Sequence, residues 1–505
     1  RRGSSLLTHF HCDRSYDTLI DMIRNGKHYL DSLRDGRTVF LDGQVVDDVT
    51  THPAFAQAAK SVAKLYDYQC EPEHIELMTF ESPTSGERVS RCWELPRSYE
   101  QLVTRRLALT SWAELTCGMM GRSPDHVASV LGGLVMGIDL FKQYDENRAA
   151  ALLDYYDYAR DNDLYLSYVI INPQADKSKG PSEQPDKYLV AAICDEDSEG
   201  ITVKGSKMLG TGAAISNEVL LAGFQVLHEG DEPYAFTAMV PINAKGVKLL
   251  SRRSYAASVP STFDYPLSSL FDENDAVIYF DEVKIPWDRV FIHRDIKMAQ
   301  AQWRQTRSHV HQNYQCAIRL MVKLRFLLGI ARKIAETNAI IDFPQVKETL
   351  GELAGKVGVI EGLVKGMEAS GERYGDYYLP DPRLLCSTQV LSQELYPEIV
   401  LMIRRLAGGG VITLPSSFKD FEVPEIADII GKTQKSPVLD SEEKVKLFKL
   451  AWDALGSEFG SRHLQYEMFY QGPTHVVRGQ AFENYDWGAC TSMVEELMAS
   501  YDRPK

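Results

Sequence analysis

The sequence lacks the features of a membrane-spanning protein and of one that binds nucleic acid. None of its 505 residues belongs to a run approaching the ~18–20 apolar residues that a membrane-spanning helix needs. Residues 1–5 do not begin the apolar core of a signal peptide. The net charge of −15, from 55 basic and 70 acidic residues, repels phosphate backbones and anionic lipid. We therefore expect a cytoplasmic globular protein without a nucleic-acid or membrane partner.

Paired cysteines are also missing. The eight cysteines are scattered singly without a CxxC pair, which excludes a disulfide framework and a zinc ribbon. His9, His11 and Cys12 offer metal-binding atoms near the terminus, but we interpret them as incidental composition and expect no metal site.

Motifs of the common nucleotide-binding and hydrolytic enzymes are absent as well. Gly210-Thr211-Gly212 lies between two strand-like runs and opens no helix, so it is not a dinucleotide fingerprint. The sequence has no GxxxxGK[ST], no G-x-S-x-G and no HExxH. Kinase, serine-hydrolase and zinc-peptidase activities lose their main support.

The apolar pattern that is present divides the chain into three zones. Residues 1–165 are mostly helical in pattern, with helices expected over 99–120 and 123–141, the second starting at Ser123-Pro124. Residues 166–295 contain short β-rich runs and predict an antiparallel β domain. Residues 296–505 return to helical stripes, at 321–336, 345–367 and 445–455. The expected class is α+β, and the 50 aromatic residues (19 Phe, 25 Tyr, 6 Trp) favour packed interiors.

Five short strings resemble, in the same order, those of the flavin-dependent 4-hydroxyphenylacetate 3-hydroxylase family. They are TTHPAF at 50–55, GMMGRSPD at 118–125, NPQ at 172–174, DYPLSS at 264–269 and IPWDRVF at 285–291. The resemblance extends from about residue 24 to about residue 480. It implies an acyl-CoA-dehydrogenase-like fold whose C-terminal four-helix bundle assembles a homotetramer.

The resemblance also implies a two-component oxygenase. A separate flavin reductase supplies reduced FAD, which reacts with dioxygen to give a flavin hydroperoxide. One oxygen atom is then placed ortho to a phenol hydroxyl. This component needs no nicotinamide, in agreement with the missing fingerprint.

Site residues follow from the same resemblance. Arg105 matches the arginine whose charge favours the phenolate. The positions that match flavin contacts are Val169, Ile170, Gln174, Ala175, Asp176, Lys177 and Thr211, together with the turn containing Gly472, Thr474, His475 and Arg478, which is expected on the phosphate side.

The sequence departs from the family pattern in the pocket. Leu109 replaces a tyrosine and Tyr168 replaces a histidine, and both losses remove groups that hydrogen-bond the phenol oxygen. Tyr168 can donate through its hydroxyl but is no base near neutral pH. Phe224 and Gln225 occupy substrate positions, and Phe224 with Leu109 is expected to form an apolar wall. We expect a tyrosine-like or carrier-bound phenol; a non-phenolic or amine substrate and a non-catalytic scaffold remain alternatives.

One further alternative is a lyase that resembles 4-hydroxybutyryl-CoA dehydratase, which holds an iron–sulfur cluster through three cysteines and a histidine. Its His-plus-seven-Cys spacing occurs at His309 and Cys316. Its pair of cysteines four residues apart does not occur, because Cys117 has Ala113 and Gly121 at that distance. At least one ligand is missing, so the monooxygenase is favoured.

Overall fold

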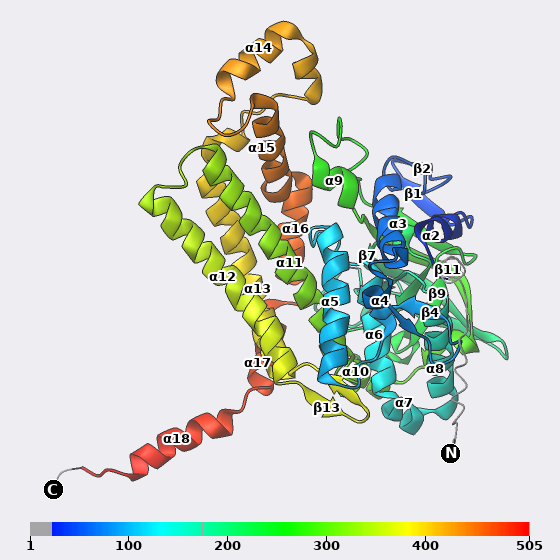
Figure 1. The fold of residues 1–505 in the computed structure, drawn as a ribbon. Helices are drawn as coiled ribbons and strands as arrows, with labels where there is room; N and C mark the ends of the chain where they lie inside the picture. The colour runs from blue at the N-terminus through cyan, green and yellow to red at the C-terminus, as the bar shows by residue number, and fades with distance from the viewer. Residues whose placement is uncertain (1–22, 174, 504–505) are drawn as a thin grey trace, which may run out of the picture.

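The computed structural model describes residues 23–173 and 175–503 (Figure 1), so His9, His11, Cys12 and Gln174 lie outside the described residues. The N-terminal helices are α2 (Gly26–Ser32), α3 (Ala56–Cys70), α4 (Ile75–Met78), α5 (Tyr99–Leu115), α6 (Pro124–Met136), α7 (Ile138–Tyr144) and α8 (Glu146–Asp161). A hairpin of β3 (Thr79–Glu81) and β4 (Arg88–Ser90) lies between α4 and α5. The helix expected over 123–141 breaks at Gly137, where a Cβ atom would lie 2.3 Å from Thr306 Cα.

The central region consists of two sheets. The six-stranded sheet has the order β2 (Gln44–Val45), β1 (Thr38–Leu41), β10 (Val247–Ser251), β11 (Asp275–Pro286), β7 (Gly200–Thr211) and β6 (Ala192–Glu196). The four-stranded sheet has the order β12 (Val290–Ile292), β9 (Thr237–Pro241), β8 (Glu218–Leu221) and β5 (Leu166–Val169). The short helix α9 (Pro266–Phe271) precedes β11.

Two strand pairs differ from the antiparallel expectation. β1 pairs with β10, and β5 with β8, in parallel. Each of these pairs joins segments that are far apart in the chain, and such pairings leave no short-range sequence signal. Because β5 and β8 are parallel and Val169 pairs with Leu221, the two strands end side by side, and the chain leaves both at the same end of the sheet. The predicted flavin stretch after β5 and the predicted substrate residues Phe224 and Gln225 therefore start from neighbouring points.

The remaining chain is helical apart from a hairpin of β13 (Glu372–Tyr374) and β14 (Tyr377–Leu379). Its helices are α10 (Ile296–Gln305), α11 (Ser308–Thr337), α12 (Pro344–Ala369), α13 (Pro382–Ala407), α14 (Pro424–Thr433), α15 (Ser441–Leu455), α16 (Glu458–Phe469), α17 (Thr474–Glu483) and α18 (Trp487–Ala499). The helices α11, α12, α13 and the α15–α16 pair pack together, and α11 also contacts α5 and α6. The expected α+β class with a C-terminal helical bundle is confirmed. Within the described ranges, no helix is long and apolar enough to cross a membrane.

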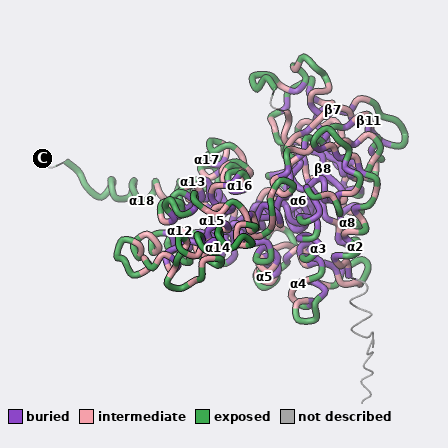
Figure 2. Tube along the Cα trace, turned by 90° about the horizontal axis from the view of Figure 1, so that it is seen from above, coloured by how far each residue is buried: buried purple, intermediate pink, exposed green. Residues whose placement is uncertain are grey.

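Helix α6 joins the bundle to the β region, and all of its residues are buried (Figure 2). It crosses α11 closely, because a Cβ atom on Gly133 would lie 2.4 Å from Ser308 Cα. Backbone atoms cannot yield as a flexible side chain does. A glycine at position 133 is therefore required by packing.

We predict that Gly133→Ala lowers the free energy of unfolding by about 1–3 kcal/mol, because the added methyl group separates α6 from α11. Gly351→Ala on α12 is the matched control, since position 351 is exposed and no atom lies within 4 Å of the added Cβ. The control should be neutral or stabilising by up to ~1 kcal/mol. Urea unfolding at one protein concentration measures both, and equal effects would contradict the packing argument.

Candidate functional site

The loop between α5 and α6 carries Arg122 to the junction of the three parts of the chain. Gly118 has a φ of +67°, and a Cβ there would lie 2.7 Å from Arg319 O. The Arg122 N–H donates to Glu273 Oε1 over 2.5 Å, and Tyr165 Oη donates to Arg122 O over 2.7 Å. The loop backbone is thus fixed on both sides before the arginine side chain makes any contact.

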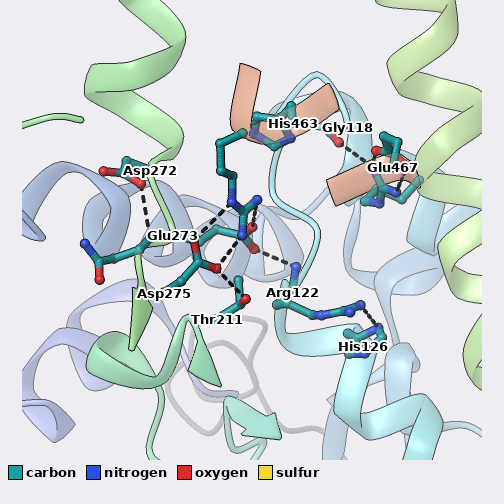
Figure 3. Close-up of polar contacts among 12 residues, drawn as sticks. Gly118, Arg122, His126, Thr211, Asp272, Glu273, Asp275, His463 and Glu467 are labelled. Atoms are coloured by element: carbon teal, nitrogen blue, oxygen red, sulfur yellow. Dashed lines mark hydrogen bonds and ion pairs between the residues drawn. The ribbon is translucent and has the colours of Figure 1, made fainter. Parts of the chain in front are cut away.

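Two clusters of buried charge surround this loop (Figure 3). Glu467 on α16 accepts from Arg319 and Lys323 of α11 over 2.7 and 2.9 Å. Burial alone would raise the pKa of Glu467, but these two cations lower it to about 2. Asp275 at the start of β11 pairs with Arg462 and Arg252 over 2.6 and 2.7 Å. Each of these cations has a carboxylate partner, and the clusters hold α11, α16 and β11 together.

The guanidinium of Arg122 has a different environment. It donates to Tyr168 Oη over 3.0 Å and lies 3.4 Å from His126 Nδ1. Its Cζ lies 5.0, 5.3 and 5.6 Å from the ring centres of Tyr168, Tyr466 and Tyr470. No carboxylate of the described chain forms an ion pair with this guanidinium, although Arg122 is only 6% exposed. Such a buried cation is suited to an anionic oxygen of a ligand.

His126, in the first turn of α6, is fully buried beside Arg122. Burial, then the positive charge of Arg122, lowers the pKa of His126 well below its usual value. The imidazole is therefore neutral near pH 7. Its Nδ1 lies 3.1 Å from Gln315 Oε1 and its ring centre 5.2 Å from that of Tyr168.

Tyr168, at the end of β5, completes this group. Arg122 and Gln312 both donate to its hydroxyl oxygen, so its own O–H proton remains for a ligand. Burial raises the pKa of Tyr168, with Arg122 opposing the shift. The tyrosine is a hydrogen-bond donor and no base at neutral pH, as the sequence indicated.

The structure does not place Tyr168 beside Arg105. The Arg105 guanidinium is fully buried and donates instead to Cys92 O over 2.8 Å and to Ser129 Oγ over 2.7 Å. Burial lowers the pKa of Arg105. Leu109 is a core residue of α5, whereas Phe224 is 41% exposed and packs on Trp303 of α10. Leu109 and Phe224 thus have different surroundings, and the common wall expected of them stays a prediction.

Several of the predicted flavin positions lie at the ends of strands in the two sheets. Val169 is buried and Ile170 half-buried at the end of β5, and the following loop is exposed at Ala175, Asp176 and Lys177. Thr211 ends β7, and its hydroxyl donates to Asp275 Oδ1 over 2.6 Å. Thr211 Oγ1 can therefore only accept from a flavin N–H. Gln225 is half-buried after β8.

The predicted C-terminal turn follows α16, which carries Tyr466 and Tyr470. Gly472 has a φ of +110°, and its carbonyl accepts from Gln393 Nε2 over 2.9 Å. Thr474 and His475 are exposed at the start of α17. Arg478 is exposed and pairs with Glu394 over 2.8 Å, so a phosphate would have to compete with that carboxylate.

Sequence reasoning missed three residues of this site: Arg122, His126 and Lys207. The GMMGRSPD string itself could have indicated the first two, because Arg122 lies inside it and His126 follows it directly. Lys207 on β7 is buried, and its ammonium donates to Asn172 Oδ1 over 2.8 Å. Its Nζ would lie 3.8 Å from a Cβ on Gly223, between the loops that follow β5 and β8. Burial lowers the pKa of Lys207 to about 7.

The cluster ligands of a dehydratase are not assembled in the described chain. Cys316 Sγ lies 3.7 Å from His126 Nδ1, while His309 Nε2 lies 3.5 Å from the Gln389 amide. Among the residues of 23–173 and 175–503, the one group with metal-ligand spacing is the partly exposed set Glu71, Glu73 and His74. Cys117 is in neither arrangement.

Comparison with known proteins identifies the family. The models described as 4-hydroxyphenylacetate 3-hydroxylase N terminal and C terminal match residues 25–292 and 299–499. The 4-hydroxyphenylacetate 3-monooxygenase oxygenase component of Geobacillus sp. (strain PA-9) is 32% identical and covers 94% of this chain and 96% of its own. Pyoverdin chromophore biosynthetic protein PvcC of Pseudomonas aeruginosa is 33% identical, covering 95% and 96%.

Solved structures agree. The oxygenase component HpaB, complexed with FAD and 4-hydroxyphenylacetate, superposes with a TM-score of 0.89 at 30% identity, covering 94% of this chain and 98% of that one. An archaeal 4-hydroxybutyryl-CoA dehydratase has a TM-score of 0.86 but 24% identity, which shows a common fold alone. The chain belongs to the 4-hydroxyphenylacetate 3-hydroxylase family. It is the oxygenase component of a two-component, flavin-dependent monooxygenase, and its cofactor is FAD.

Lys207 provides a test of the site's electrostatics. The unfolded chain binds a proton on this lysine up to about pH 10.5, whereas the folded chain loses it near pH 7. The contribution of Lys207 to stability therefore increases with pH across this interval, by at most about 1.4 kcal/mol per pH unit.

We predict that the free energy of unfolding of the wild type, minus that of Lys207→Met, rises between pH 7 and pH 10 and is constant below pH 6. Denaturant unfolding at each pH measures this difference. Lys204→Met is the control, because Lys204 pairs with Glu282 at the surface of the same strand. A difference independent of pH would show that Lys207 is not held in a dry site.

Proposed function

We propose that this enzyme hydroxylates the ring of a phenolic substrate whose oxygen lies beside Arg122. The observation that carries the proposal is the buried Arg122 guanidinium, surrounded by three tyrosine rings and paired with no carboxylate of the described chain. A phenolate supplies both an anionic oxygen and a flat apolar ring. Arg122 thereby takes the role that the sequence suggested for Arg105.

The neighbouring residues divide the remaining tasks. Arg122 favours the phenolate form, which has the more electron-rich ring. Tyr168 donates its O–H proton to the substrate oxygen. His126, held neutral by burial, accepts the proton that the phenol releases.

The predicted flavin positions offer polar groups that fit FAD. Their exposed backbone groups at 175–177, the Lys177 ammonium and the exposed His475 offer partners for its polar and phosphate groups, and Thr211 offers an acceptor. When bound in its reduced form, FAD supplies the activation of dioxygen that the protein's side chains cannot provide. A separate flavin reductase is the source of that reduced FAD, since relatives are named as the oxygenase component of the enzyme.

The substrate end away from Arg122 is proposed to extend toward solvent. Phe224 and Val226, after β8, are 41% and 70% exposed, so this rim leaves room for a larger group. A tyrosine-like compound or a phenol attached to a carrier protein would fit such an open rim. The biosynthetic relative PvcC is in keeping with this proposal.

The decisive experiment supplies photoreduced FAD, dioxygen and a panel of phenols, and measures hydroxylated product and hydrogen peroxide. We expect product from the wild type. Arg122→Met should weaken phenol binding by about 10–150-fold, the loss of a charged hydrogen bond of ~1.5–3 kcal/mol, and divert oxygen to hydrogen peroxide.

Arg105→Met is the comparison variant, and folding of both variants is checked by circular dichroism. Coupling lost in Arg105→Met but retained in Arg122→Met would restore the original assignment of Arg105. Oxygen consumption without ring-hydroxylated product from any phenol would favour an amine, a non-phenolic substrate or a non-catalytic scaffold.

The homotetramer is proposed from the C-terminal helices. Helix α18 has no buried residue and projects from the rest of the chain (Figures 1 and 2). Its apolar side chains are exposed by 48–68%: Trp487, Met493, Val494, Leu497 and Met498. A second copy of the chain would cover them, and an apolar groove of about 480 Å³ between α11 and α12 offers a place to dock.

We predict that light scattering finds a tetramer for the full chain and a smaller species for the double variant Leu497→Glu, Met493→Glu, whose charges oppose burial. Lys446→Glu on α15 serves as a charge control. A stable monomer of the full chain with intact helicity would contradict the assembly.

A further inference from the structure

We propose that Gln315 is a positioning residue that fixes the tautomer of His126 and leaves the lone pair on Nε2, the atom that receives the substrate proton. The inference rests on the proposed function of His126. Gln315 on α11 is 1% exposed and lies between two groups of α6. Its Oε1 is 3.1 Å from His126 Nδ1, and its Nε2 donates to Asp125 Oδ2 over 3.0 Å.

The carboxylate determines which way the amide of Gln315 faces. A carboxylate accepts hydrogen bonds only, so the amide N–H₂ group must face Asp125. Ser123 Oγ donates to the other oxygen, Oδ1. Burial raises the pKa of Asp125, but the bonds from Ser123 and Gln315 and the charge of Arg105 all favour its ionised form. Arg105 thus supports the site through Asp125.

The amide in turn determines the state of the imidazole. With its N–H₂ group on Asp125, Gln315 presents a carbonyl oxygen to His126, and an oxygen acceptor requires a proton on Nδ1. A neutral imidazole with a proton on Nδ1 carries its lone pair on Nε2. The Gln312 amide nitrogen, 3.4 Å from Nε2, is a donor and agrees with this tautomer.

Arg122 favours the opposite tautomer. Its Nη1 lies 3.4 Å from the same Nδ1 and can only donate. Gln315 has the shorter contact, so Nδ1–H points to the amide. The other groups that face His126 are Tyr168 on β5, and Cys316 and Arg319 on α11. None of these provides an acceptor for Nδ1 that matches the Gln315 carbonyl.

This arrangement gives the proton a defined path. The phenol O–H bond breaks, its electron pair remains on the oxygen beside Arg122, and an N–H bond forms at His126 Nε2. The imidazolium that results donates through Nδ1 to Gln315, whose other end is bound to the Asp125 carboxylate. The buried negative charge thereby offsets the repulsion between His126 and Arg122.

Nitrogen-15 NMR of histidine-labelled protein without flavin or substrate tests the tautomer directly, and His126→Gln assigns the signal. We expect a protonated Nδ1 and an unprotonated Nε2 in the wild type. In Gln315→Leu, Arg122 should donate to Nδ1 and shift the proton to Nε2. Gln315→Glu should restore the original pattern, because a protonated glutamic acid can donate to Asp125 and accept from Nδ1.

A proton on Nε2 in the wild type, or an unchanged pattern in Gln315→Leu, would overturn the proposal. The wild-type measurement decides even if Gln315→Leu does not fold. This readout needs no turnover, so it fails independently of the proposed function.

Activity then tests the consequence. Gln315→Leu should lower kcat for phenol hydroxylation by about 10²-fold, with a small change in KM and recovery in Gln315→Glu. An inverted tautomer with unchanged kcat would show that His126 does not take the substrate proton, which overturns its proposed role.

Discussion

The site depends on the ion pairs that the buried Glu467 carboxylate forms. This carboxylate pairs with both Arg319 and Lys323 of α11 from the facing helix α16, and the same Arg319 donates to Gly118 O over 3.0 Å. One anion therefore ties two bundle helices together and anchors the loop that ends in Arg122. A buried cation pair without this carboxylate would be strongly unfavourable.

Arg122 differs from the charged residues on either side of its loop, because those residues pair with one another. Arg319 and Arg462 have carboxylate partners at 2.6–2.7 Å, so their charges are satisfied within the fold. The Arg122 guanidinium faces Tyr168, His126 and aromatic rings instead. The fold thus keeps the positive charge of Arg122 available in a buried region, where an anionic oxygen gains most from it.

The polar groups around that charge are oriented by neighbours that never touch a ligand. Asp125, Gln315 and His126 form a line of hydrogen bonds from α6 to α11 and back. Close packing of the same two helices at Gly133 keeps the donors and acceptors of this line within reach. The contact between α6 and α11 therefore provides both close helix packing and the hydrogen bonds that orient His126.

The sequence by itself determined the α+β class, the helical stripes and the family, because periodicity and short strings are local properties. The stripes that it placed at 321–336, 345–367 and 445–455 fall within α11, α12 and α15. It could not determine the parallel pairing of β5 with β8, nor that Tyr168 meets Arg122 from 46 positions away and not Arg105. Those contacts join distant segments, and only the tertiary structure decides which buried arginine faces Tyr168 and the rings of Tyr466 and Tyr470.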